Sequence, residues 1–283
     1  GAGAGETSYQ AYDLAVAAEA ERTLAELKEQ REKTDKPFFL LISLFCPHPP
    51  YIARRSDFEK FENALPAPRL PQPTQEHPSL AAWRKAGRTN EISEEATAKS
   101  RAAYYGLVRL VDQIAGRITS ALEGRENTVT IYASDHGESL GERGLWWKST
   151  MYDESAKVPL IIRAPGMSAG AVDQRVVSLM DLSATILKWA DAAALPGHVG
   201  RDLRVTEDWA DTISSSYYGG LMNIEVSDIR HRMLRDGRYK LMWFDGAQPM
   251  LFDLEADPNE LHDLSNDPNH AESLSHLTKK LHA

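Results

Sequence analysis

The fold is indicated most directly by the run Thr128-Val129-Thr130-Ile131-Tyr132-Ala133-Ser134-Asp135-His136. Its first seven residues are mostly β-branched or aromatic, which predicts a buried strand. Asp135 and His136 follow at the carboxyl end of that strand, where open α/β sheets usually bind their ligands. A carboxylate oxygen beside an imidazole nitrogen suits a divalent cation. A helix cap and a hydrogen-bonded surface histidine are the alternative interpretation of the pair.

The loop after this strand adds a cation and two aromatic side chains. Gly137 and Gly141 allow sharp backbone turns, and Lys148 offers a compact positive charge to an anionic substrate. Trp146 and Trp147 precede that lysine. One of the indoles, with Trp147 as our candidate, is placed to stack on a sugar ring or a quaternary ammonium. Packing in the core is the alternative for both tryptophans.

Helical and extended patterns alternate on both sides of this loop. We expect helices at 9–31, 95–122 and 181–192, strands at 38–44, 158–163 and 175–179, and an irregular proline-rich excursion at 63–92. Residues 1–5, Gly-Ala-Gly-Ala-Gly, are expected to be flexible. Alternating helices and strands predict a doubly wound α/β architecture.

The pattern changes after Gly197, where short extended runs are separated by turn signals such as Asp236-Gly237. We expect strands near 214–218, 231–235, 239–244 and 250–254, and a helix from about Asn269. These elements predict a small antiparallel sheet with a terminal helix.

Five segments in this order resemble the type I sulfatases of the alkaline phosphatase superfamily, and most closely their choline-sulfatase-like and phosphonate-monoesterase-like branch. The segments are Pro37–Leu44 with the loop Cys46-Pro47-His48-Pro49-Pro50-Tyr51, Arg101–Asp112, Asp135–Lys148 with the following Tyr152–Glu154 and Val158–Gly166, Val177–Leu187, and Arg235–Leu241 with Leu251–Pro258. The resemblance implies an alkaline-phosphatase-like α/β sandwich, with a mainly parallel central sheet flanked by helices. It places the C-terminal part of the catalytic domain at 1–200 and a small α+β subdomain at 201–283.

The same resemblance implies hydrolysis of a sulfate ester, carried by a small molecule or a saccharide. In such a sulfatase Asp135 and His136 bind a divalent cation, calcium in the first instance. Lys148 holds a sulfate oxygen, and His48 bonds the transferred group or protonates the leaving oxygen. Many sulfatases have asparagine at the position of His136, and imidazole is a softer ligand, so manganese and zinc stay open. Arg143 receives no catalytic role, because a surface ion pair explains it equally well.

The sulfatase nucleophile is expected outside this sequence. Family members open with paired aspartates and a cysteine motif whose cysteine becomes formylglycine, and neither is present here. The single cysteine, Cys46, belongs to the histidine loop and is predicted to be a small buried side chain. We therefore expect an N-terminal part of the same protein to carry the formylglycine, and this chain alone to be inactive.

Two other functions stay open: a phosphonate monoester or phosphodiester hydrolase of the same superfamily, and a non-catalytic binding chain. The chain has 32 basic and 41 acidic residues and a net charge of -9, which argues against nucleic acid and anionic membranes as partners. No apolar run approaches the roughly 20 residues of a membrane span. A homo-oligomer, and a location in the cytoplasm or the periplasm, are left open.

Overall fold

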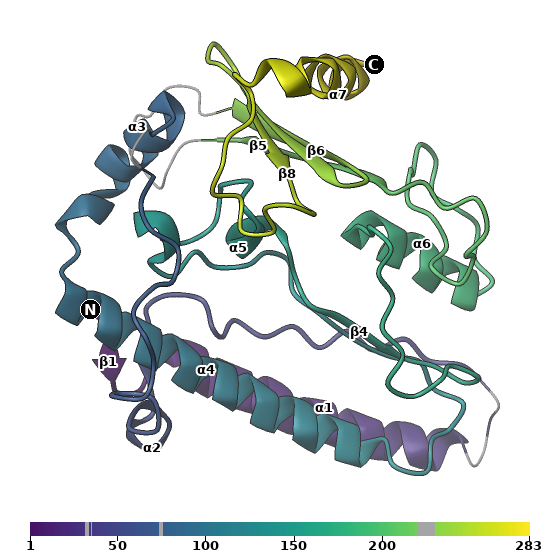
Figure 1. Cartoon of the computed structure of the whole chain (residues 1–283). Helices are drawn as coiled ribbons and strands as arrows, with labels where there is room; N and C mark the ends of the chain where they lie inside the picture. The colour runs from purple at the N-terminus through teal and green to yellow at the C-terminus, as the bar shows by residue number, and fades with distance from the viewer. Residues whose placement is uncertain (32–33, 35, 74–75, 220–229) are drawn as a thin grey trace. The chain divides into compact units, whose positions relative to one another are not determined.

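A computed structural model describes residues 1–31, 34, 36–73, 76–219 and 230–283 (Figure 1). The chain divides into two compact units. The first consists of residues 1–69, 91–130 and 163–166, and the second of residues 70–90, 131–162 and 167–283.

Two long helices form the body of the first unit. Helix α1 (Ser8–Arg31) lies alongside helix α4 (Glu94–Ala121), as Figure 1 shows. Ser93 caps α4, because its hydroxyl accepts a hydrogen bond from the backbone N–H of Ala96 at 3.1 Å. The buried apolar side chains recur at helical spacing: Ala17, Ala20 and Leu24 on α1, and Ala103, Leu107, Leu110 and Ile114 on α4. Both predicted helices are confirmed.

Short elements complete this unit. Strand β1 (Gly3–Ala4) pairs in parallel with β2 (Ile52–Ala53), so the predicted flexibility of residues 1–5 is wrong for these two residues. Helix α2 (Arg55–Phe58) follows β2. Gly106 of α4 permits the close approach of these elements, since a Cβ there would lie 2.7 Å from the Cβ of Ala53.

The predicted buried strand at 38–44 is wrong. This segment joins no sheet within the described residues, and the side chains of Phe39 and Leu41 are 72% and 77% exposed. Its run of aromatic and aliphatic residues is typical of a buried strand, but a strand becomes buried only when neighbouring elements bond to it and cover it.

Two further predicted strands are confirmed in position, although the first is less buried than predicted. Strands β3 (Thr130–Ala133) and β4 (Leu160–Arg163) pair with each other. Tyr132 is 41% exposed and Ile161 64% exposed, so the prediction that the strand before Asp135 is buried is wrong.

The second unit contains the predicted antiparallel sheet. Its strands β5 (Thr212–Tyr218), β6 (Arg230–Asp236), β7 (Tyr239–Phe244) and β8 (Met250–Asp253) pair in sequence order. The turn between β6 and β7 contains Gly237 at φ 56°, a left-handed conformation that favours glycine. Helix α7 (Ala271–His282), preceded by a 3-10 helix at Pro268–His270, packs against β6 and β7 (Figure 1).

Each face of this sheet has its own core, because successive side chains of a strand point to opposite faces. Leu234, Leu241 and Leu251 pack with Leu277 of α7. The second core joins the sheet to helix α3 (Pro78–Gly87) and to the segment after Asp135. Its members are Leu80, Trp83, Leu145, Met151, Tyr152, Met233, Met242, Phe244, Met250 and Phe252. The sheet therefore supports the loop that carries the candidate site residues.

The proline-rich region 63–92 is more ordered than predicted. It contains helix α3 (Pro78–Gly87) and a 3-10 helix at Thr89–Glu91. Trp83 of α3 is 1% exposed. Pro78 occupies the start of α3, where a missing N–H costs nothing, so this proline begins a helix rather than breaking one.

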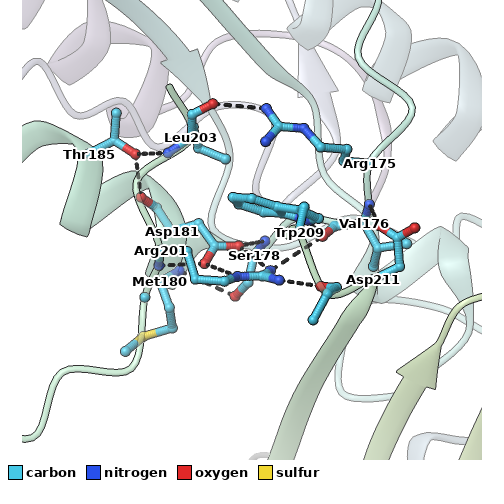
Figure 2. A network of polar contacts seen from close by, with 12 residues as sticks. Arg175, Val176, Ser178, Met180, Asp181, Thr185, Arg201, Leu203, Trp209 and Asp211 are labelled. Carbon is cyan, nitrogen blue, oxygen red and sulfur yellow. Dashed lines mark hydrogen bonds and ion pairs between the residues drawn. The ribbon is translucent and has the colours of Figure 1, made fainter. Parts of the chain in front are cut away.

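The short strand predicted at 175–179 is absent, and side chains bond its backbone instead (Figure 2). The N–H of Val176 donates to Asp211, and its carbonyl accepts from the indole N–H of Trp209 at 3.1 Å. Ser178 and Asp181 form a capping box that begins helix α6 (Leu179–Trp189), which confirms the predicted helix in this region. Within the described part of the chain, no helix is long and apolar enough to cross a membrane.

Candidate active site

Asp135 and His136 contact each other directly after β3. The backbone N–H of His136 donates to Asp135 Oδ1 at 2.9 Å, and His136 Nε2 lies 3.5 Å from Asp135 Oδ2. The carboxylate is 83% exposed and the imidazole 35% exposed. The pair thus has the accessibility that a ligand-binding position requires.

The tautomer of His136 follows from its other contact. Its Nδ1 lies 2.9 Å from the carbonyl oxygen of Gly137, and a carbonyl can only accept, so Nδ1 carries the proton. In the neutral ring Nε2 is then a lone-pair acceptor facing the carboxylate. Two acceptors at this separation are stabilised by a cation between them, either a proton on Nε2 or a metal ion.

This geometry fits one part of a metal site. The described residues contain no group of three or more His, Cys, Asp or Glu side chains placed to hold a metal ion. The chain therefore offers the Asp135 and His136 donors, and a complete coordination shell requires ligands from elsewhere.

Gly137 brings the loop against helix α5 (Asp153–Ala156). Its N–H donates to the carbonyl of Ser155 at 2.7 Å, and a Cβ at this position would collide with the carbonyl oxygen of Glu154. The predicted turn at Gly141 is also confirmed, since its φ of 89° lies in the left-handed region. Gly137 serves close packing, and Gly141 serves the turn.

The stretch from Glu138 to Trp147 closes on itself like a hairpin. Ser139 N–H donates to the Trp147 carbonyl at 2.9 Å, and Gly141 N–H donates to the Leu145 carbonyl at 2.8 Å. The carboxylate of Glu138 accepts from the N–H groups of Trp147 and Leu140 at 2.6 and 3.0 Å. Residues 138–149 are called the lysine loop from here on.

Lys148 and Trp147 lie at the end of the lysine loop. Lys148 is half-buried. Trp147 is also half-buried and packs against the core beneath the sheet, whereas Trp146 is 3% exposed. These positions favour the packing interpretation for Trp146. The substrate-binding role of Trp147 stays a prediction.

Arg143 is not part of a surface ion pair, and that interpretation is wrong. Its side chain is 3% exposed, and its guanidinium donates to the carbonyl of Glu260 at 3.0 Å and to that of Asn259. The same group lies 4.2 Å from the ring centroid of Tyr152, and burial raises the pKa of that tyrosine. Arg143 therefore ties the lysine loop to the C-terminal segment.

A buried lysine pairs with two carboxylates, one of which lies at the start of α5. Lys240 of β7 is 1% exposed, and its Nζ is 2.7 Å from both Asp153 Oδ1 and Glu260 Oε1. Burial raises the pKa of Asp153, but Lys240 outweighs it and holds that pKa below its usual value. Burial raises the pKa of Glu260, against the opposing effect of Lys240. Periodicity gave no sign that this lysine and glutamate would be buried together.

His48 lies in the first unit, whereas the other candidate residues lie in the second. Its Nδ1 is 2.7 Å from the carbonyl oxygen of Pro49, which places the proton on Nδ1 and assigns any role in catalysis to Nε2. Cys46 is 6% exposed, and burial raises the pKa of its thiol. The prediction of a small buried cysteine is confirmed.

Family models match the chain along its length. A model described as Sulfatase matches residues 4–192, and a model described as N-sulphoglucosamine sulphohydrolase, C-terminal, matches residues 141–283. The choline-sulfatase of Rhizobium meliloti (strain 1021) is 30% identical over 281 residues, covering 92% of this chain and 53% of that protein. The chain spans about half the length of the curated relatives it matches.

Solved structures show the same fold. A phosphonate monoester hydrolase from Silicibacter pomeroyi matches with a TM-score of 0.74 and 27% identity, covering 91% of this chain and 58% of that one. A 2-O GAG sulfatase matches with a TM-score of 0.79 and 20% identity, covering 98% and 63%. The second match concerns the fold alone. Together they confirm the predicted α/β fold class.

Proposed function

The chain belongs to the sulfatase family of the alkaline phosphatase superfamily, and on this premise we propose that the complete protein hydrolyses a sulfate ester. The substrate is a small molecule or a saccharide that carries the ester. The formylglycine nucleophile is proposed to reside in an N-terminal part of the same protein.

One observation carries the proposal: His136 presents Nε2, and not Nδ1, to the exposed carboxylate of Asp135 at 3.5 Å. An acceptor pair of this kind, at the start of a loop that also contains Lys148, suits a cation that meets an anionic ester. A bound divalent cation would neutralise charge on the ester and on the attacking oxygen. Calcium is the first candidate, and the imidazole ligand keeps manganese and zinc as alternatives.

The residues of this chain supply the remaining functions. The ammonium of Lys148 would hold an oxygen of the transferred group, where negative charge is retained in the transition state. His48 would bond that group or protonate the leaving oxygen through Nε2, since its Nδ1 proton is engaged with Pro49. Trp147 would contact the alcohol portion of the substrate.

Hydrolysis of a phosphonate monoester or phosphodiester is the second candidate. The likeness to a phosphonate monoester hydrolase at 27% identity, together with an imidazole at the metal position, supports it. A non-catalytic binding chain is a third, weaker alternative, because His48, Asp135, His136 and Lys148 are all retained.

The test uses the complete protein and compares the turnover of an aryl sulfate with that of an aryl phosphodiester. We expect faster sulfate turnover, and a loss of at least about 100-fold in Lys148→Ala and His48→Ala with the melting temperature preserved. His136→Ala should also lower the metal content measured by elemental analysis. Faster phosphodiester turnover would favour the second candidate, and turnover of neither ester would contradict both hydrolase proposals.

A further inference from the structure

The backbone around Lys148 adopts an unfavourable conformation on both sides of the lysine. Trp147 has a φ of 63° and Ser149 a φ of 75°, and neither is glycine. A non-glycine residue in this region is energetically unfavourable and persists only when its surroundings hold it. Neighbouring groups must therefore maintain the backbone that presents the lysine.

On the N-terminal side, both backbone polar groups of Trp147 are bonded within the lysine loop. Its N–H donates to Glu138 Oε1 at 2.6 Å, and its carbonyl accepts from Ser139 at 2.9 Å. The same Glu138 oxygen accepts from Leu140 at 3.0 Å. One carboxylate thus holds both ends of the hairpin-like turn that precedes Lys148.

On the C-terminal side, the holding group is a buried histidine from the antiparallel sheet. His231 of β6 is 2% exposed, and its ring forms a hydrogen bond with the backbone of Ser149. Burial lowers the pKa of His231, and the bond to Ser149 opposes that effect, as expected when the ring donates to a carbonyl. Its Nε2 is buried and has no hydrogen-bond partner in the described structure, so Nδ1 is the donor.

The ring of His231 is itself fixed by aromatic neighbours. Its centroid lies 5.3 Å from that of Tyr217 and 5.7 Å from that of Phe244, which meets it edge-on. The donor to Ser149 is therefore supplied by a rigid strand and its core, not by a mobile surface side chain.

We infer that Glu138 and His231 are positioning residues for Lys148, and that they hold the backbone on either side of it so that its ammonium meets the anionic group of the substrate. The inference rests on the proposed role of Lys148. Without these two groups, Trp147 and Ser149 would relax to ordinary dihedral angles and displace the lysine.

The first experiment measures kcat/KM for the aryl sulfate in the complete protein. His231→Leu removes the donor, and His231→Asn retains an N–H at the position of Nδ1. We expect a loss of about 10–100-fold in the leucine variant and recovery of most of it in the asparagine variant, because small displacements of a positioning group have effects of this size. Glu138→Ala and Glu138→Gln form a second pair of this kind, in which glutamine retains the accepting oxygen.

His77→Leu is the matched control. His77 stacks on the same Phe244 at 3.9 Å, but its Nε2 bonds the carbonyl of Gln248 and not the lysine loop. We expect it to lower the melting temperature about as much as His231→Leu does, with unchanged kcat/KM. Equal activity losses in the two variants would show that His231 acts only through packing in the core, which would overturn the inference.

A double-mutant cycle and an activity-independent measurement complete the test. His231→Leu combined with Lys148→Ala should be no worse than Lys148→Ala alone, and additive losses would overturn the inference. Amide hydrogen exchange over residues 145–151 should be at least 10-fold faster in His231→Leu than in His77→Leu. If the wild-type protein turns over no ester, the proposed function fails. Unchanged exchange in His231→Leu would separately contradict the positioning role of His231.

Discussion

Arg143 is a charged residue that is buried in the folded protein. Arginine is mostly exposed in proteins, yet this guanidinium is enclosed by Glu154, Tyr152 and two backbone carbonyls. Its own φ of 56° adds a strained residue at the centre of the lysine loop. The planar group with five donors satisfies several acceptors at once, which a lysine could not do in the same geometry.

We predict that Arg143→Ala destabilises the protein by about 3 kcal/mol, because it leaves buried acceptors without a donor. Urea unfolding would measure the change. Arg22→Ala is the control, since Arg22 is 60% exposed in its ion pairs with Glu19 and Glu26, and we expect a change within about 0.5 kcal/mol. Equal effects of the two substitutions would contradict the structural role of Arg143.

His231 makes a prediction about pH. Burial, with a smaller contribution from the nearby His77, lowers its pKa from 6.5 to about 4 against the opposing bond to Ser149. Between these two values the unfolded chain binds the proton more tightly than the folded protein does. Stability therefore falls as the pH falls from about 6.5 to about 4, by roughly 3 kcal/mol in total for this group.

His231→Asn removes this titration. We expect its free energy of unfolding to depend less steeply on pH between 4 and 6.5 than that of the wild type, with the two curves parallel above pH 7. Denaturant unfolding at several pH values would measure both curves. His77 also has a lowered pKa because of burial, so part of the slope should remain. Identical slopes would show that His231 does not titrate in this way.

Gly137 in the loop after β3 and Gly116 in helix α4 differ in the space around them, so substituting each by alanine tests whether the absence of a side chain serves close packing. Gly137 lies where a Cβ would collide with the backbone of α5, whereas Gly116 in α4 has open space around the same position. Gly116→Ala should stabilise the protein by about 0.5–1 kcal/mol, because alanine favours helix. Gly137→Ala should destabilise it and reduce ester turnover, because the loop must move away from α5. Thermal unfolding and activity assays would reveal whether the two changes have opposite signs.

Over the chain as a whole, residues distant in sequence hold the lysine loop in place. Lys240 joins Asp153 at the start of α5 to Glu260, which lies beyond the antiparallel sheet. The backbone N–H of Asp153 also donates to Glu260 Oε2 at 2.8 Å. The C-terminal segment is thus part of the support of the candidate site, and the sheet shares a core with residues 145–152.

We predict that Lys240→Met costs about 3–5 kcal/mol in unfolding free energy, since it leaves the fully buried carboxylate of Glu260 without its cation, whereas Asp153 keeps Lys157 at 3.8 Å. Lys99→Met is the control, because Lys99 pairs with Glu95 on an exposed face of α4. The loss should shrink if Glu260→Gln is added, because the uncompensated buried charge is then removed. A loss unchanged by that second substitution would show that packing, not charge, explains the effect.

Local patterns in the sequence were sufficient for the two long helices, the antiparallel strands and the turn at Asp236-Gly237, because periodicity, caps and turn residues act over a few positions. The resemblance of ordered motifs identified the family. Tertiary structure alone decided the burial of Arg143 and Lys240, the helix within 63–92 and the exposure of 38–44. These outcomes depend on which distant segments supply hydrogen-bond partners and cover, and on long-range contacts that a local pattern does not contain.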